Sequence, residues 1–247
     1  MGRLRSTYRN LINHIFWQTA VFRGKSLPDF DSILIVSPHP DDEVLGCGGL
    51  LSHQNRQNKS ASIVYLTQGE NCDARIDPDT LKVERRKLTD KALQAIGQDM
   101  NKTFFLNYKD GSVSQDNPET EKLKTLVRQI NPQAVFVTHR FEGWNDHEKA
   151  FDIMQNILAD MPVDLYEYCV WFWYTTPFSK FFDIKWKGAR IRRMSEKEYS
   201  AKKQAIEAYM NGKSREGIAY SGVLPKILLK FCSIKKELFF KSGVKGS

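Results

Sequence analysis

A chain of 247 residues with 41% hydrophobic residues and a net charge of +8 is long enough to bury one α/β core without covalent cross-links. Its four cysteines are widely spaced and form no CxxC pair, which argues against a disulfide framework or a cysteine zinc site and favours a reducing, cytoplasmic location. No apolar run approaches the length that crosses a bilayer, and the residues after the basic N-terminus are too polar for a signal-peptide core.

The positive charge is concentrated at the two ends of the chain. Residues 1–26 carry a charge of +5 with no acid, residues 213–247 carry +6, and the middle is slightly negative. Apolar positions at helical spacing accompany this charge at both ends: Leu4, Tyr8, Leu11, Ile12, Ile15 and Phe16, and then Leu224, Ile227, Leu228, Phe231 and Leu238. We therefore divide the chain into a basic N-terminal segment (1–28), a catalytic domain (29–212) and a basic C-terminal segment (213–247).

The basic terminal segments have two interpretations. Amphipathic helices usually bury their apolar face, so the favoured interpretation is that they pad the sheet or form a dimer contact. The functional alternative is a surface that contacts an anionic membrane or a polyanionic glycan, which would make the protein peripheral to a membrane.

Strands and helices alternate along the middle of the chain. The first predicted strand is the apolar run at residues 33–37, and a helix with acidic residues in its first turn follows it. Further strands are predicted at 62–67, 103–106, 134–138 and 165–171, and helices at about 80–96, 119–130, 147–159 and 195–210. This alternation predicts a single Rossmann-like α/β domain, with a mainly parallel sheet and helices on both faces. Ligands bind beyond the carboxyl ends of such strands.

The strongest chemical signal is the run PHPDDE, from Pro38 to Glu43, where the first strand meets its helix. His39 and Asp42 are three residues apart, and a histidine with a carboxylate is a normal part of a zinc site. The adjacent Asp41 would face the same cleft, where a carboxylate can act as general base towards a water activated by the metal. First-turn acids also stabilise a helix dipole, but that role requires neither the imidazole nor the two prolines.

A catalytic zinc ion needs a third protein ligand. The five histidines of the chain are His14, His39, His53, His139 and His147. His139 and His147 both follow the predicted strand 134–138, at the sheet edge where His39 is expected, so either is a candidate. Asp146, beside His147, is a candidate to orient a ligand or the metal contact.

Two other functional classes fit the sequence poorly. The run Gly46-Cys47-Gly48-Gly49 is not the G-x-G-x-x-G fingerprint of dinucleotide-binding folds. The basic residues avoid the PHPDDE region, and no nucleic-acid-binding signature is present, so no nucleic-acid partner is expected.

The chain resembles the PIG-L/LmbE-like N-acetylglucosaminyl deacetylases, whose signature is (A/P)-H-P-D-D-E after the first strand. Pro38 to Glu43 match this signature intact. Other matches in register are Gly46, Gly48, Gly49, Thr67-Gln68-Gly69-Glu70, Arg85, Ala92, Ile96-Gly97, Tyr108-Lys109-Asp110-Gly111 and Ala201 to Tyr209. Leu88 stands where the family usually has Glu. The resemblance covers about residues 30–212.

The resemblance implies a metal-dependent hydrolase that removes the acetyl group from an N-acetylated amino sugar in a glycan, a nucleotide sugar or a lipid-linked sugar. It implies that His39, Asp42 and His147 hold Zn²⁺, with Fe²⁺ as an alternative, and that Asp41 is the general base. Arg85 and Asp110 resemble substrate contacts of the family, although each is equally interpretable as a surface charge.

The second family motif departs from the usual pattern. Trp144-Asn145-Asp146-His147 stands where the family has H-P-D-H, so the first histidine, which is thought to steady the developing oxyanion, is lost. His139 from the same loop, or zinc alone, is the expected replacement. This loss leaves two alternatives open: a different hydrolase or non-catalytic metal-containing sugar-binding protein, and a non-enzymatic protein that binds polyanions or membrane surfaces.

Overall fold

The computed structural model describes residues 2–243, with side chains from residue 6 onward. The strands are β1 (Lys25–Ser26), β2 (Ser32–Ser37), β3 (Ser60–Tyr65), β4 (Thr103–Phe105), β5 (Ala134–Thr138), β6 (Asp164–Tyr168), β7 (Ala189–Arg193) and β8 (Lys236–Ser242). The helices are α1 (Gly2–Arg23), α2 (Asp42–Arg56), α3 (Pro78–Ala95), α4 (Glu119–Ile130), α5 (Asn145–Ile157), α6 (Phe172–Thr175), α7 (Glu196–Met210) and α8 (Lys226–Cys232), with short 3₁₀ helices η1 (Met100–Lys102), η2 (Phe178–Phe182) and η3 (Trp186–Gly188).

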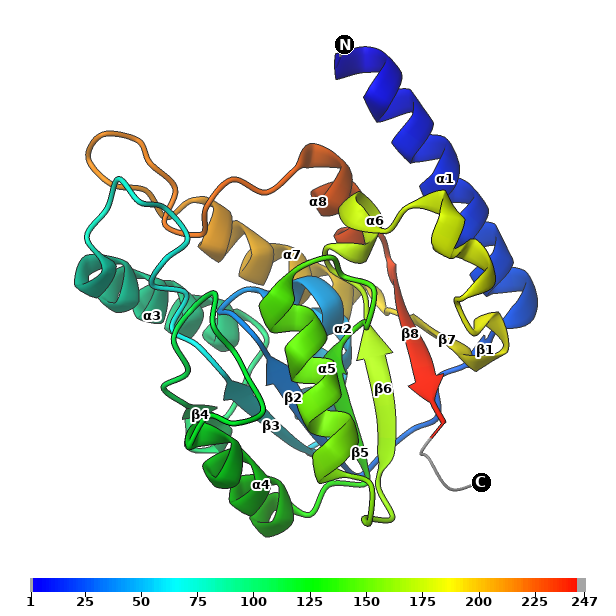
Figure 1. The fold of residues 1–247 in the computed structure, drawn as a ribbon, viewed down its shortest axis with the longest axis horizontal. Helices are drawn as coiled ribbons and strands as arrows, with labels where there is room; N and C mark the ends of the chain where they lie inside the picture. The colour runs from blue at the N-terminus through cyan, green and yellow to red at the C-terminus, as the bar shows by residue number, and fades with distance from the viewer. Residues whose placement is uncertain (1, 244–247) are drawn as a thin grey trace.

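All strands join one sheet in the order β1-β7-β8-β6-β5-β2-β3-β4 (Figure 1). The five strands from β6 to β4 are parallel to one another, as the alternation of strands and helices predicts. From β2 the chain winds outward through β3 to β4, and then returns to build β5 and β6 on the other side of β2. The switch point therefore lies between β2 and β5, and ligands bind at such a point in open α/β sheets.

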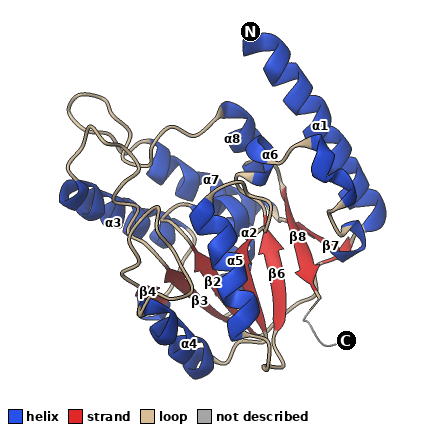
Figure 2. Cartoon of the chain, in the orientation of Figure 1, coloured by secondary structure: helices blue, strands red, loops and turns tan. Residues whose placement is uncertain are grey.

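Helices cover both faces of this sheet, in keeping with the predicted class (Figure 2). Alternate side chains of β2 enter two separate cores: Ile33 and Ile35 pack among α1, α2, α3, α7 and α8, whereas Leu34 and Val36 pack against α4 and α5. Fully buried parallel strands read as continuous apolar runs for this reason. Gly46 is required on α2 because a Cβ atom there would overlap the ring of Tyr168 on β6.

The basic C-terminal segment contributes strand β8 to the sheet. β8 lies between β6 and β7 and pairs antiparallel with both. The carboxylate of Glu237 accepts hydrogen bonds from the backbone N–H groups of Gly49 (2.7 Å) and Leu50 (2.9 Å), and the buried Lys202 Nζ donates to it at 2.8 Å. These bonds tie β8 to α2 and α7.

The N-terminal segment is a helix that lies along the β7 end of the sheet and extends past it (Figure 1). Ile12, Phe16 and Ala20 are buried, and the Asn13 side chain donates to the Trp173 carbonyl at 2.6 Å. The padding interpretation therefore holds for one face of α1. No helix in residues 2–243 is long and apolar enough to span a bilayer.

Candidate active site

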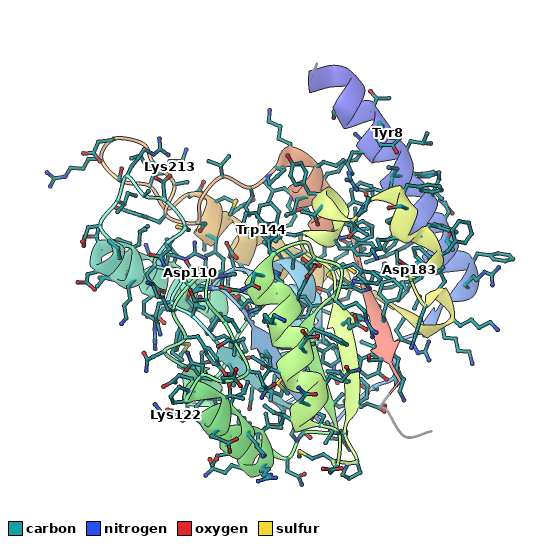
Figure 3. All side chains as sticks on the ribbon, viewed as in Figure 1. Tyr8, Asp110, Lys122, Trp144, Asp183 and Lys213 are labelled. Carbon is teal, nitrogen blue, oxygen red and sulfur yellow. The ribbon has the colours of Figure 1, made fainter. Side chains whose placement is uncertain are left out.

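The loops after β2 and β5 meet at the switch point of the sheet. The loop after β2 carries His39 and Asp41, and Asp42 begins α2 directly after it. The loop after β5 leads into α5, which carries His147 in its first turn. Because parallel strands end at the same sheet edge, residues more than a hundred positions apart share one cavity. Figure 3 shows the labelled Asp110 and Trp144 on this side of the sheet.

Three side chains converge with the geometry of a metal site. His39 Nδ1 lies 3.2 Å from His147 Nε2 and 3.3 Å from Asp42 Oδ2, and the last two atoms are 3.3 Å apart. Bonds of about 2.0–2.1 Å to a tetrahedral zinc ion place ligand atoms about 3.3 Å from one another. The residues fit a divalent ion with three protein ligands, which leaves a fourth position open.

The other nitrogen of His39 is held by two carboxylates. Its Nε2 lies 3.0 Å from Asp110 Oδ1 and 3.2 Å from Asp146 Oδ2. Both acids are fixed by backbone donors: Asp110 accepts from Asn71 N–H (2.8 Å), and Asp146 accepts from Gly111 N–H (2.7 Å). A carboxylate on the far nitrogen of a ligand histidine fixes the ring and makes it a better donor to the metal.

A buried acid that the sequence does not reveal lies beside the other nitrogen of His147, at ion-pair distance and without a hydrogen bond. His147 Nδ1 lies 3.5 Å from Glu142 Oε2, and Glu142 is fully buried. Glu142 accepts hydrogen bonds from the backbone N–H groups of Val170 (2.9 Å) and Trp171. The one available signal is its place in the loop between β5 and His147.

Acidic groups outnumber basic ones around the cavity. Burial lowers the pKa of His39, but its hydrogen bonds to the carboxylates of Asp110, Asp146 and Asp42 outweigh burial and raise the pKa well above its usual value. Burial raises the pKa of Asp42, and the adjacent His147 and His39 reverse this so that the net shift is downward. Such an excess of negative charge around two imidazoles favours a bound cation.

Asp41 lines the same cavity but lies outside the ligand triangle, which consists of His39 Nδ1, Asp42 Oδ2 and His147 Nε2. Its backbone has φ of 117°, a conformation that costs about 1–3 kcal/mol in a non-glycine residue. The Glu43 carboxylate accepts the Asp41 N–H at 2.9 Å and helps to hold this turn. Burial raises the pKa of Asp41 well above its usual range, and the positive charge of Arg85, 3.6 Å away, opposes that rise.

Arg85 is buried and ties two loops together at the floor of the cavity. Its guanidinium donates to the carbonyl groups of Pro40 and Tyr220, the latter at 3.0 Å. Gly69 packs against it with φ of 67°, and a Cβ atom at that position would overlap the guanidinium. Arg85 therefore lines the cavity as a buried support and is not a surface charge.

The structure does not bring His139 to the cavity. Its ring is buried among Phe141, Phe172 and Phe240, and its Nδ1 accepts the Phe141 N–H at 3.1 Å. Burial lowers its pKa to about 4. His139 therefore does not replace the missing family histidine, because its ring packs in the aromatic core and not beside His147.

The cavity has a volume of about 410 Å³, and an aromatic pair closes one side of it. Trp144 is 50% exposed and meets Trp171 edge to face at 5.0 Å between ring centroids. Residues 221–224 also line the cavity. Two larger hollows lie elsewhere, along β4 and along α1, and among the described residues they contain no cluster of ligating side chains.

Comparison with known proteins places this geometry in a family. Residues 34–158 match the PIG-L family, whose description is GlcNAc-PI de-N-acetylase. The matched segment contains the ligand triangle, Asp41 and the two carboxylates that hold His39.

Several solved structures share the fold. An N,N'-diacetylchitobiose deacetylase from Pyrococcus horikoshii is 20% identical, with 76% of this chain and 73% of that chain covered and a TM-score of 0.60. A conserved protein from Thermus thermophilus is 27% identical over 76% and 82% of the two chains, with a TM-score of 0.56. A deacetylase–teicoplanin complex from the teicoplanin biosynthesis pathway is 14% identical over 85% and 97%, with a TM-score of 0.62.

Proposed function

We propose, from the premise that the chain belongs to the PIG-L family of GlcNAc-PI de-N-acetylases, that it removes the acetyl group from an N-acetylated amino sugar. The family assigns a hydrolase that acts on N-acetyl amide bonds. The sugar substrate and the roles of individual residues are our proposal, and they are supported by the side chains of the cavity.

The observation that carries the proposal is the triangle of His39 Nδ1, His147 Nε2 and Asp42 Oδ2, with sides of 3.2–3.3 Å, at the floor of an open cavity. Two imidazole nitrogens and one carboxylate oxygen form a donor set that suits zinc, and ferrous iron accepts the same set. A zinc ion bound there supplies Lewis acidity, which polarises an amide carbonyl and acidifies water.

Asp41 is the proposed proton carrier. Its carboxylate shares the cavity with the ligand triangle, and Asp41 stands before the start of α2 with a positive φ, whereas Asp42 is the first residue of the helix. A carboxylate in this place can accept the proton of the attacking water and return it to the departing amine. Arg85, beside Asp41, is proposed to hold that carboxylate in position, since their closest atoms are 3.6 Å apart.

The walls of the cavity favour a sugar as the group that enters. Trp144 and Trp171 offer aromatic faces, while Asn71 and Ser221 offer hydrogen-bonding groups nearby. A volume of about 410 Å³ accommodates one or two sugar rings, since ligand pockets span about 300–1,000 Å³. Free, nucleotide-linked and lipid-linked N-acetylglucosamine and a polysaccharide end are the candidates.

The experiment is acetate release by the zinc-loaded protein from a panel of these four substrate types, with mass spectrometry to detect the loss of one acetyl group. We expect release from at least one member, and none from the same protein after chelation. A protein that binds zinc and an N-acetylated sugar but releases no acetate would be a sugar-binding protein and would overturn the proposal.

A further inference from the structure

Helix α1 has a second apolar face that nothing in residues 2–243 covers. Beside the buried Ile12 and Phe16, an exposed stripe along α1 includes Tyr8, Leu11 three residues later and Phe22 about three turns further on, with exposed fractions of 60%, 58% and 88%. Side chains at this spacing lie on one face of a helix. Large aromatic side chains exposed together are uncommon on a soluble surface and indicate an interaction site.

The 3₁₀ helix η2 extends this apolar surface. Phe182 is 87% exposed and Phe178 is 40% exposed. Phe22 of α1 and Phe182 of η2 line the same hollow of about 540 Å³, with Phe181 and Trp186 at its base. Figure 1 shows η2, in yellow, beside the C-terminal half of α1. We refer to Tyr8, Leu11, Phe22, Phe178 and Phe182 as the α1/η2 face.

Positive charge surrounds the α1/η2 face. Residues 1–28 contain no acid, and Arg23 lines the hollow beside Phe22. Lys25, Lys185 and Lys187 are exposed on the neighbouring segments. The nearby acid Asp183 is paired with Lys180 at 3.0 Å.

We infer that the α1/η2 face docks on the surface of an anionic lipid bilayer. Apolar and aromatic side chains flanked by Lys and Arg are the composition of helices that lie in the membrane interface, where the rings enter the headgroup region and the cations contact anionic lipids. A second copy of this chain fits less well, because two α1 helices packed together would bring like charges against each other.

The experiment is flotation of the full chain with phosphatidylcholine vesicles that contain about one third phosphatidylserine. We expect the protein to float with these vesicles at low salt and not with pure phosphatidylcholine. Binding should weaken by about tenfold or more at physiological salt, because the charge contribution is screened. The double substitution Phe22→Ser with Phe182→Ser should also weaken it by about tenfold or more.

The matched control is Val83→Ser with Met100→Ser, which removes two exposed apolar side chains on α3 and η1, far from this face. It should leave flotation unchanged, and thermal melting of both variants should confirm that they fold. The inference is overturned if the wild-type chain does not float at low salt or if the Phe22/Phe182 variant floats as well as the control. It is also overturned if the wild type is a dimer in solution that this variant dissociates.

Discussion

His39 Nδ1 and His147 Nε2 lie 3.2 Å apart, although the two residues come from loops after different strands. A divalent ion placed between these two nitrogens would lie within bonding distance of both. Asp42 Oδ2 completes the triangle. The first prediction follows from this arrangement.

Purified protein should carry close to one divalent ion per chain, and His39→Ala or His147→Ala should reduce that content to near zero. Each substitution leaves two ligands, too few to hold zinc tightly. Metal analysis by mass spectrometry checks this. His53→Ala is the matched control, and this variant should retain the ion. His53 lies in the last turn of α2 and bonds Glu198 of α7, outside the ligand triangle. Undiminished metal in both ligand variants would end the assignment.

Asp41→Asn should retain the metal and lower kcat by about 10²–10⁴-fold, since asparagine cannot accept the proton. Asparagine tolerates positive φ better than most residues, so the turn should survive. Metal content and turnover are measured on the same sample. Near-normal turnover would move the general base elsewhere, with Asp146 the next candidate in the cavity.

Asp110→Asn and Asp146→Asn should weaken metal binding by about 10–100-fold, because both carboxylates hold Nε2 of the ligand His39. Excess metal should restore most of the turnover. Competition with a chelating dye measures the affinity, and Asp152→Asn, an exposed acid on the same helix as Asp146, is the control. Normal metal affinity with a raised KM would instead support the substrate contact expected for Asp110 from the sequence.

Lys202→Met should destabilise the protein by about 3–5 kcal/mol, because it leaves the buried Glu237 carboxylate without its cation. Adding Glu237→Gln should recover part of this loss, since the neutral amide removes the unpaired buried charge and its oxygen can still accept from either Gly49 or Leu50. Urea unfolding measures both.

Removal of residues 223–247 should unfold the chain, because β8 would be lost from within the sheet. A stable, folded truncation would contradict this account of the C-terminal segment.

The sequence predicted the parallel half of the sheet and missed the antiparallel part, for a physical reason. β5 and its neighbours are buried on both faces, so they read as apolar runs. β7 reads ARIRR and β8 reads KELFFKS, and their charged side chains lie at the rim or in pairs such as Lys202–Glu237. Their pairing depends on contacts between distant segments, which local patterns do not record.

The site shows the same division. The PHPDDE motif was sufficient to predict His39, Asp41 and Asp42 at one strand end. Asp110 and Asp146 converge on the far nitrogen of His39 because of the paths of the loop that contains Asp110 and of the loop that leads into α5. No spacing rule in the sequence predicts such paths.

His139 supplies the last prediction, which concerns stability and pH. Burial among aromatic rings lowers its pKa from 6.5 to about 4, and the carboxylate of Glu167, 3.8 Å from Nε2, only partly offsets that effect. In the unfolded chain, His139 therefore binds a proton as the pH falls below 6.5. In the folded chain it binds that proton only near pH 4. The folded state loses stability as pH falls through this window, by about 3 kcal/mol in total.

The substitution His139→Phe removes the titrating group and keeps an aromatic ring against Phe172 and Phe240. At pH 7.5 the variant should be somewhat less stable, because the Phe141 N–H loses its acceptor. Between pH 6.5 and 4.5 the difference should shrink and then reverse, because only the wild type is destabilised by keeping a buried imidazole neutral. Urea unfolding of both proteins across this range measures the difference, and parallel pH curves would show that folding does not lower the pKa of His139.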